Sequence, residues 1–186
     1  MWAGIRYVSL SPNLTTVLFR GFLFGSAAIA ILALLPSVAN EYVGGGAMVY
    51  GTLLGCFGLG AIGGAFLNGR MRETFSNEWI VRGACLTFAL ACVGLGFSRD
   101  PLLSHVLLIP AGASWVLSLS LFNVSIQLST PRWVVGRALA LYQTATFGGM
   151  ALGSWVWGSV ADISEPQWAL VGASVVLVLC AAVGLR

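Results

Sequence analysis

Six long apolar stretches, separated by short polar segments, dominate this sequence of 186 residues. An α-helix rises ~1.5 Å per residue, so about 20 apolar residues cross the ~30 Å hydrocarbon core of a bilayer. Each stretch has about this length and is therefore predicted to be a membrane-spanning helix. The stretches are Gly21–Ala39, Ala47–Asn68, Trp79–Ser98, Leu102–Leu128, Ala138–Ala161 and Gln167–Leu185.

The composition excludes a water-soluble fold. Only 8% of the residues are charged and 58% are hydrophobic, and the mean hydropathy is +0.92. A soluble domain has ~25% charged residues, so this chain cannot build a water-exposed surface. We therefore predict an all-α membrane protein, with residues 1–17 as a cytoplasmic or interfacial segment and residues 18–186 as one six-helix transmembrane domain.

The basic residues, all of them arginines, predict the orientation of the chain. If the N-terminus is cytoplasmic, eight arginines fall on the cytoplasmic side and only Arg99 falls outside, which satisfies the positive-inside rule. Both termini are therefore expected in the cytoplasm, and Arg20, at the edge of the first stretch, is expected to extend toward the membrane surface. The residues expected in cytoplasmic loops include Arg70, Arg72, Arg132, Gly136 and Arg137. The arginines form no stripe interleaved with aromatic residues, so no nucleic-acid partner is expected.

A glycine-rich segment in the second stretch has a weaker copy in the fifth. Six glycines lie between Gly51 and Gly64, and the segment 57–64 (FGLGAIGG) matches 147–154 (FGGMALGS) at six positions, counting Ile with Leu and Gly with Ser. Each copy is the middle helix of a triplet, and an offset of three helices predicts two triplets inverted in the membrane. Small residues let helix backbones approach closely in lipid. The glycines expected to pack helices are Gly51, Gly55, Gly60, Gly64, Gly149 and Gly153.

Several motifs carry a family resemblance over essentially the whole chain. The most specific is the segment 131–142 (PRWVVGRALALY) followed by 147–153 (FGGMALG); 4–8 (GIRYV), 112–115 (GASW) and 121–124 (LFNV) add to it. The chain resembles the C-terminal six helices of a major facilitator superfamily transporter. It is most similar to the bacterial efflux branch that includes enterobactin exporters and macrolide-efflux-like proteins. One departure is Asn68, where the superfamily has an acid in its loop signature.

The resemblance implies secondary active transport across a bacterial inner membrane, with export of a small amphipathic compound such as a drug or a siderophore-like molecule. Such a transporter has twelve spans and a substrate cavity between two six-helix halves. This chain then needs a second half, either a missing N-terminal half or a second copy of itself. Because Met1 falls inside what resembles the central loop, truncation is expected; the alternatives are an inactive or a purely structural membrane fragment.

By the same resemblance, five residues are expected to face a substrate path: Trp115, Asn123, Tyr142, Gln143 and Phe147. The alternative is that they make interhelical hydrogen bonds or aromatic packing. No cofactor is expected. The coupling ion is expected to be a proton, although no uncompensated acid lies deep in a stretch to carry it.

Catalysis and metal binding are not expected. Six spans also suit an intramembrane serine protease, which needs a serine and a base within hydrogen-bond reach. The single histidine, His105, is nine residues before Ser114 on the same predicted helix, ~13.5 Å along its axis, which is too far. The four cysteines have no metal-ligand spacing, so no metal site is predicted.

Overall fold

The computed structural model of the chain describes residues 12–42 and 46–183. This part is a bundle of α-helices with one short π-helix and no strand. The elements are α2 (Pro12–Ser37), η1 (Val38–Tyr42), α3 (Gly46–Thr74), α4 (Asn77–Phe97), α5 (Pro101–Ser129), α6 (Val135–Ile163) and α7 (Pro166–Ala182). Most of the predicted segment 1–17, with its motif 4–8, and Arg186 lie outside the described residues. The predicted boundary at residue 17 falls inside α2.

The ends of the helices follow from local sequence signals. Asp100 caps α5 by accepting a hydrogen bond from the backbone nitrogen of Leu102 at 3.0 Å, and Pro101 occupies the first turn. Pro166 likewise occupies the first turn of α7, without a side-chain cap. At the end of α2, Pro36 precedes the switch to the π-helix η1. The turns that precede α5 and α7 are thus specified locally.

Six helices occupy the six predicted stretches, and four of them are long and apolar enough to cross a membrane. These four are Leu14–Asn40, α3, α4 and α5. Helix α7 has 17 residues in the described part of the chain, and α6, although 29 residues long, does not belong to the four. Polar residues such as Gln143, Thr144 and Thr146 lower the hydropathy of α6.

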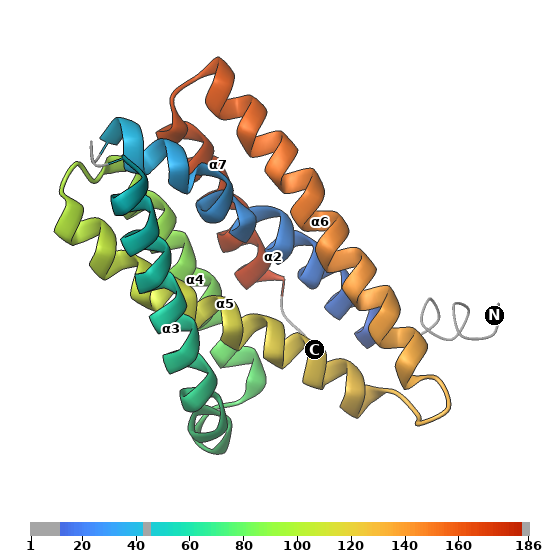
Figure 1. Ribbon diagram of the computed structural model, residues 1–186. Helices are drawn as coiled ribbons and strands as arrows, with labels where there is room; N and C mark the ends of the chain where they lie inside the picture. Colours follow the sequence, from blue (N-terminus) through green and yellow to red (C-terminus); the bar gives the residue numbers. More distant parts are fainter. Residues whose placement is uncertain (1–11, 43–45, 184–186) are drawn as a thin grey trace.

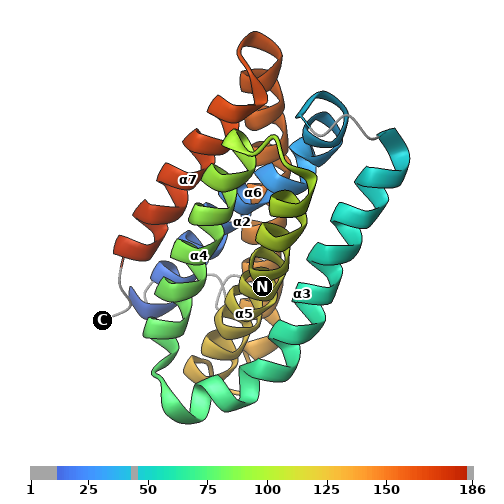
Figure 2. The same cartoon turned by 90° about the vertical axis from the view of Figure 1, so that its left-hand side faces the viewer.

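Successive helices run in opposite directions, so the start of one helix lies near the end of the next. The starts of α2, α4 and α6 and the ends of α3, α5 and α7 lie at one end of the bundle, which we call the arginine end (Figure 1, Figure 2). Every described arginine except Arg99 belongs to helices or connections at this end: Arg20, Arg70, Arg72, Arg82, Arg132 and Arg137.

Helix α2 runs through the middle of the bundle beside α6 (Figure 1) and also packs against α7. Helix α3 packs mainly against α5, and α4 lies between α5 and α7. Figure 2 shows α3 at one edge of the bundle and α7 at the opposite edge. Much of α3 is consequently exposed, whereas most of α2 is buried.

Glycines allow α3 and α5 to meet backbone to backbone. A Cβ atom added to any of three glycines would clash with a carbonyl oxygen of the facing helix, at 2.6 Å for Gly64 and closer for the other two. Such contacts are possible only without a side chain. The pairs are Gly60 with Ile109, Gly64 with Ala113, and Gly112 with Phe57.

The helices α6 and α2 make a matching set of contacts. The clashing carbonyl oxygen lies 2.5 Å from a Cβ on Gly149, 2.6 Å from one on Gly25, and closer for Gly153. In the three pairs of each set, the α6 residue lies 89 positions after its α3 counterpart, and the α5 residue lies 87 positions after its α2 counterpart. The pairs are Gly149 with Phe22, Gly153 with Ser26, and Gly25 with Thr146.

Two expectations about the glycines differ from the structure. Gly51 and Gly55 have no atom within 4 Å of an added Cβ, so they pack against no other helix among the described residues. The sequence match also pairs Gly63 with Gly153, whereas the packing pairs Gly64 with Gly153. A shift of one residue along a helix turns a side chain by about 100° around the axis. The position of the facing backbone, and not the alignment of the two sequence segments, therefore decides which glycine is needed.

Arg20 does not extend to the membrane surface as expected. Because α2 begins at Pro12, Arg20 lies more than two turns inside the helix, and its side chain is 0% exposed. Its guanidinium pairs with Glu78 of α4 at 2.7 Å and lies 5.8 Å from the ring centroid of Phe122. Glu78 also pairs with Arg82 at 2.8 Å. The arginine end of the bundle therefore contains an ionic cluster that joins α2 to α4, fully buried at Arg20 and partly exposed at Glu78 and Arg82.

Candidate functional site

Two adjoining hollows follow the faces of α5 and α6. The first, about 340 Å³, lies along α5, and the second, about 140 Å³, lies between α5 and α6. Leu119 and Asn123 line both. The first is also lined by Trp115, Val116, Ser120 and Val124, and the second by Tyr142, Gln143, Thr146, Phe147 and Met150. All five residues predicted for a substrate path therefore line one hollow or the other.

Trp115 is fixed in place by aromatic neighbours. Its ring centroid lies 6.2 Å from Phe24 of α2, 6.0 Å from Phe57 of α3 and 6.2 Å from Phe88 of α4. Aromatic pairs at these separations stabilise by about 0.5–1.5 kcal/mol beyond their burial. Trp115 thus belongs to the packed centre of the bundle and also forms part of the wall of the first hollow.

Tyr142 is the most buried of the five residues, with 3% of its surface exposed. Its hydroxyl donates a hydrogen bond to the carbonyl oxygen of Leu119 at 3.3 Å, and its ring lies against α2 at Gly21. A Cβ on Gly21 would lie 2.8 Å from this ring, so the glycine makes room for it. Tyr142 combines the two roles that the sequence left open, since it packs between helices and lines the second hollow.

The accessible part of the site combines two amide side chains, Asn123 and Gln143, with the aromatic ring of Phe147. Asn123 of α5 accepts a hydrogen bond from the side-chain nitrogen of Gln127, one turn later. Gln143 of α6 is exposed, and Phe147, one turn along α6, is 64% exposed. An amide and an aromatic ring side by side can bind a molecule that has both polar and apolar parts.

Charge is absent from both hollows, as far as the described residues form them. The available interactions are amide and hydroxyl hydrogen bonds together with apolar and aromatic contact. The described ranges also hold no group of three histidine, cysteine or acidic residues that could bind a metal ion.

Several residues of the site were not singled out from the sequence. Leu119 lies midway between Trp115 and Asn123 at four-residue spacing, and this helical spacing could have identified it. The same spacing from Tyr142 leads to Thr146 and Met150. Asn68 donates a hydrogen bond to Ser120 at 2.7 Å and so joins the end of α3 to the wall of the first hollow, a contact between distant segments for which the sequence gives no signal.

The five residues predicted for loops are exposed and separate from the hollows, but four of them lie in helical turns, because α3 extends further and α6 begins earlier than expected. Arg70 and Arg72 lie in the last turns of α3. Arg132 lies in the connection between α5 and α6, and Gly136 and Arg137 lie in the first turn of α6. All five belong to the arginine end of the bundle, and none of them lines either hollow.

Comparison with protein families matches residues 1–186 to the family described as transmembrane secretion effector, a family of the major facilitator type. Comparison with curated proteins gives no match. The match covers the whole chain and agrees with the apolar helices long enough to span a membrane. The chain is thus a multi-pass membrane protein that belongs to the transmembrane secretion effector family of major facilitator transporters.

Proposed function

We propose that this chain is one half of a secondary active transporter that exports a small amphipathic compound across a bacterial inner membrane. The other six-helix half is either a separate N-terminal half or a second copy of this chain. The observation that carries the proposal is the α5–α6 face, where two hollows combine amide groups with exposed aromatic and aliphatic side chains. An uncharged, partly polar lining suits a substrate that is itself amphipathic.

The helix contacts support an arrangement of two inverted three-helix repeats. If α2 is exchanged with α5, and α3 with α6, the glycine contacts between α2 and α6 become those between α5 and α3. The equivalent residues differ by 87 positions for α2 and α5 and by 89 for α3 and α6. Helix α4 packs on α5 as α7 packs on α2, which extends the exchange to the third helix of each triplet. Inverted repeats of this kind are general among major facilitator transporters, where rocking of one half against the other gives alternating access. Coupling to protons is part of the proposal, with the titrating carboxylate supplied by the other half.

Asn123→Ala is expected to reduce export about tenfold, equivalent to ~1.4 kcal/mol of binding, without unfolding the chain. An interhelical or intrahelical side-chain hydrogen bond in a membrane contributes only ~0.6 kcal/mol on average. The measurement is efflux of a panel of amphipathic dyes from cells that express this chain with a candidate first half. Phe147→Ala is expected to act in the same direction.

Thr144→Ala is the matched control, because Thr144 is exposed on α6, bonds only to its own helix at Ala140 in the described structure, and lines neither hollow. Equal efflux from Asn123→Ala, Thr144→Ala and the unchanged chain would contradict a substrate path on this face. Absence of efflux that depends on any pairing of halves would contradict the transport proposal as a whole.

The proposed orientation places the arginine end of the bundle in the cytoplasm. A single cysteine at Trp133, introduced into a chain whose four cysteines are replaced by alanine, is expected to react with a membrane-impermeant maleimide only after the cells are permeabilised. A single cysteine at Ser164, between α6 and α7, is expected to react in intact cells. The reverse labelling pattern would overturn the orientation, which rests on the excess of arginines at one end.

A further inference from the structure

A third and larger cavity lies on the other side of α5 from the two hollows. It has a volume of about 560 Å³, within the range of ligand-binding cavities. Its wall combines the end of α3, the first half of α4 and the middle of α5. Ser114 and Leu117 of α5 line it, whereas Trp115 and Leu119 line the hollows. The cavity is therefore separate from the proposed substrate path.

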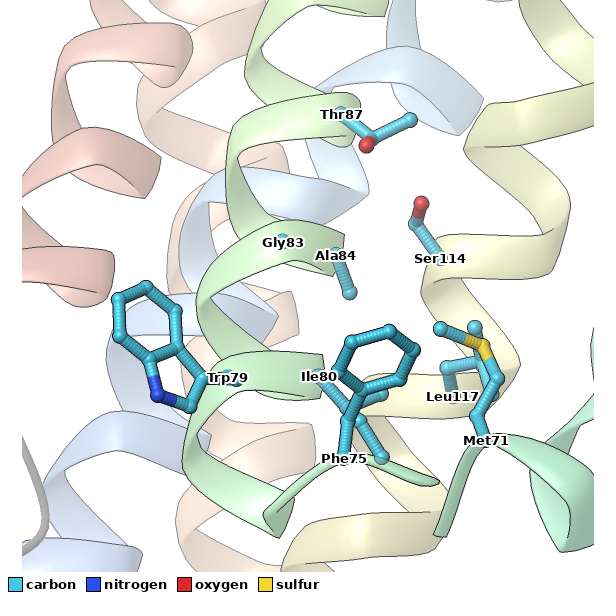
Figure 3. Close-up of a pocket in the computed structure, with 9 residues that line it drawn as sticks. All are labelled: Met71, Phe75, Trp79, Ile80, Gly83, Ala84, Thr87, Ser114 and Leu117. Carbon is cyan, nitrogen blue, oxygen red and sulfur yellow. The ribbon is translucent and has the colours of Figure 1, made fainter. Parts of the chain in front are cut away.

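The wall of this cavity is apolar except for two hydroxyl groups and the indole nitrogen of Trp79. Figure 3 shows Thr87 of α4 and Ser114 of α5 facing each other across one end, with Phe75 and Met71 at the other end. Ser114 is 4% exposed, whereas Phe75 is 55% exposed. The cavity thus extends from an open, aromatic mouth at the arginine end to a closed interior between α4 and α5.

The mouth opens on a face of α4 that is exposed in the described part of the chain. One apolar stripe follows the whole helix at alternating spacings of four and three residues, all of it exposed. An uncharged stripe of this length is typical of a helix face in contact with lipid. The stripe consists of Trp79, Gly83, Leu86, Leu90, Val93 and Phe97, and its first two members also line the cavity.

Arginines of α3 and α4 lie next to residues of the mouth. Arg70 and Arg72 flank Met71 in the last turns of α3, and the guanidinium of Arg82 lies 5.8 Å from the ring centroid of Trp79. Two acids lie in the same region: Glu73 in the last turn of α3, and Glu78, which pairs with Arg82 and with the fully buried Arg20. The exposed arginines Arg70 and Arg72 therefore provide most of the accessible positive charge beside the mouth. The N-terminus of α4, the positive end of its dipole, lies at the same place.

We propose that this cavity holds one acyl chain of an anionic phospholipid, whose headgroup lies against the arginines at the end of α3 and the start of α4. The apolar wall accepts the hydrocarbon, and Trp79 lies where tryptophans anchor at the headgroup level. Clusters of arginine beside a membrane helix bind anionic headgroups. This site is independent of the proposed transport function, since its ligand is a component of the bilayer.

Photo-crosslinking tests the site directly. The full 186-residue chain is reconstituted in nanodiscs with phosphatidylglycerol, or with phosphatidylcholine of the same chains, each with a diazirine in one acyl chain, and crosslinked residues are mapped by mass spectrometry. Crosslinks at Phe75, Ala84 and Leu117 are expected to exceed those at Leu90 on the exposed stripe. With phosphatidylglycerol the cavity crosslinks are expected to be about fivefold more frequent than with phosphatidylcholine.

Two variants separate the parts of the proposal. Gly83→Leu places a side chain at the mouth, where a Cβ meets nothing within 4 Å, and is expected to remove the cavity crosslinks while leaving those at Leu90. Gly51→Leu, at another exposed helical glycine with open space around it, is the matched control and is expected to change neither. The double variant Arg70→Gln/Arg72→Gln, at two exposed side chains, is expected to remove the preference for phosphatidylglycerol. Cavity crosslinks no more frequent than those at Leu90, or equal for both lipids, would overturn the proposal.

Discussion

Replacing Gly112 by alanine is expected to destabilise the folded bundle by about 1–3 kcal/mol, the usual cost of inserting a methyl group into a close-packed contact. The new Cβ would overlap the carbonyl oxygen of Phe57, which belongs to a helix backbone and cannot move aside as a flexible side chain can. Helices α3 and α5 would have to separate, with loss of the contacts at Gly60 and Gly64 as well. The measurement is the midpoint of thermal aggregation in detergent, followed by size-exclusion chromatography.

Gly63→Ala beside Gly64→Ala provides the matched comparison. The two glycines are neighbours in α3, but a Cβ on Gly64 would lie 2.6 Å from the carbonyl oxygen of Ala113, whereas a Cβ on Gly63 meets nothing within 4 Å. Gly64→Ala is expected to lower the midpoint. Gly63→Ala is expected to leave it unchanged or raise it, since alanine favours a helix over glycine by about 0.5–1 kcal/mol. Equal effects at the two positions would mean that α3 and α5 do not meet through the face described here.

Glu78→Gln is expected to have the largest effect of any change of a single charge in the described chain. It leaves the fully buried guanidinium of Arg20 without a counter-charge, and breaking a buried ion pair from one side costs about 3–5 kcal/mol. Two nitrogen atoms of Arg20, Nε and one terminal nitrogen, already have no hydrogen-bond partner in the described structure. The expected result is a sharp fall in the yield of folded protein and in its midpoint of thermal aggregation.

The double variant Arg20→Met/Glu78→Gln tests whether the ion pair itself is the cause. Removing both charges removes the unpaired guanidinium, so the double variant is expected to be more stable than Glu78→Gln alone, which is non-additive behaviour between contacting residues. Glu73→Gln, at an exposed acid in the last turn of α3, is the control and is expected to change stability by less than about 0.5 kcal/mol. A double variant no more stable than Glu78→Gln would contradict the pairing of Arg20 with Glu78.

The substrate-path residues illustrate what a sequence can and cannot predict. Trp115 and Asn123 are two turns apart on one helix, so their shared face follows from helical periodicity. That Tyr142 and Phe147 lie across from them depends on how α5 packs beside α6, which no local pattern specifies. Their association was expected only through the family resemblance, and the described side chains do lie together around Leu119 and Asn123.

The glycines also show what the sequence can and cannot predict, here for individual helix contacts. Their abundance in the second and fifth stretches predicts close helix contacts, and Gly60, Gly64, Gly149 and Gly153 make them. The sequence could not distinguish these from Gly51 and Gly55, which are also one turn apart but face open space. All six satisfy the same spacing rule, and only the position of the facing backbone separates them.

The sequence by itself determined that this chain lies in a membrane, where its helices run and which end carries the arginines. The length of each apolar stretch and the arginines beside it are local properties of the sequence, and they decide whether a segment spans a bilayer and in which direction. Only the tertiary structure decided that Arg20 is buried against Glu78, which glycines touch a backbone, and that a cavity opens between α3, α4 and α5. Each of these depends on the distance between segments far apart in the chain. That distance is set by the rotation and depth at which the helices pack, and a change of one residue in register moves a side chain by about 100° around its helix.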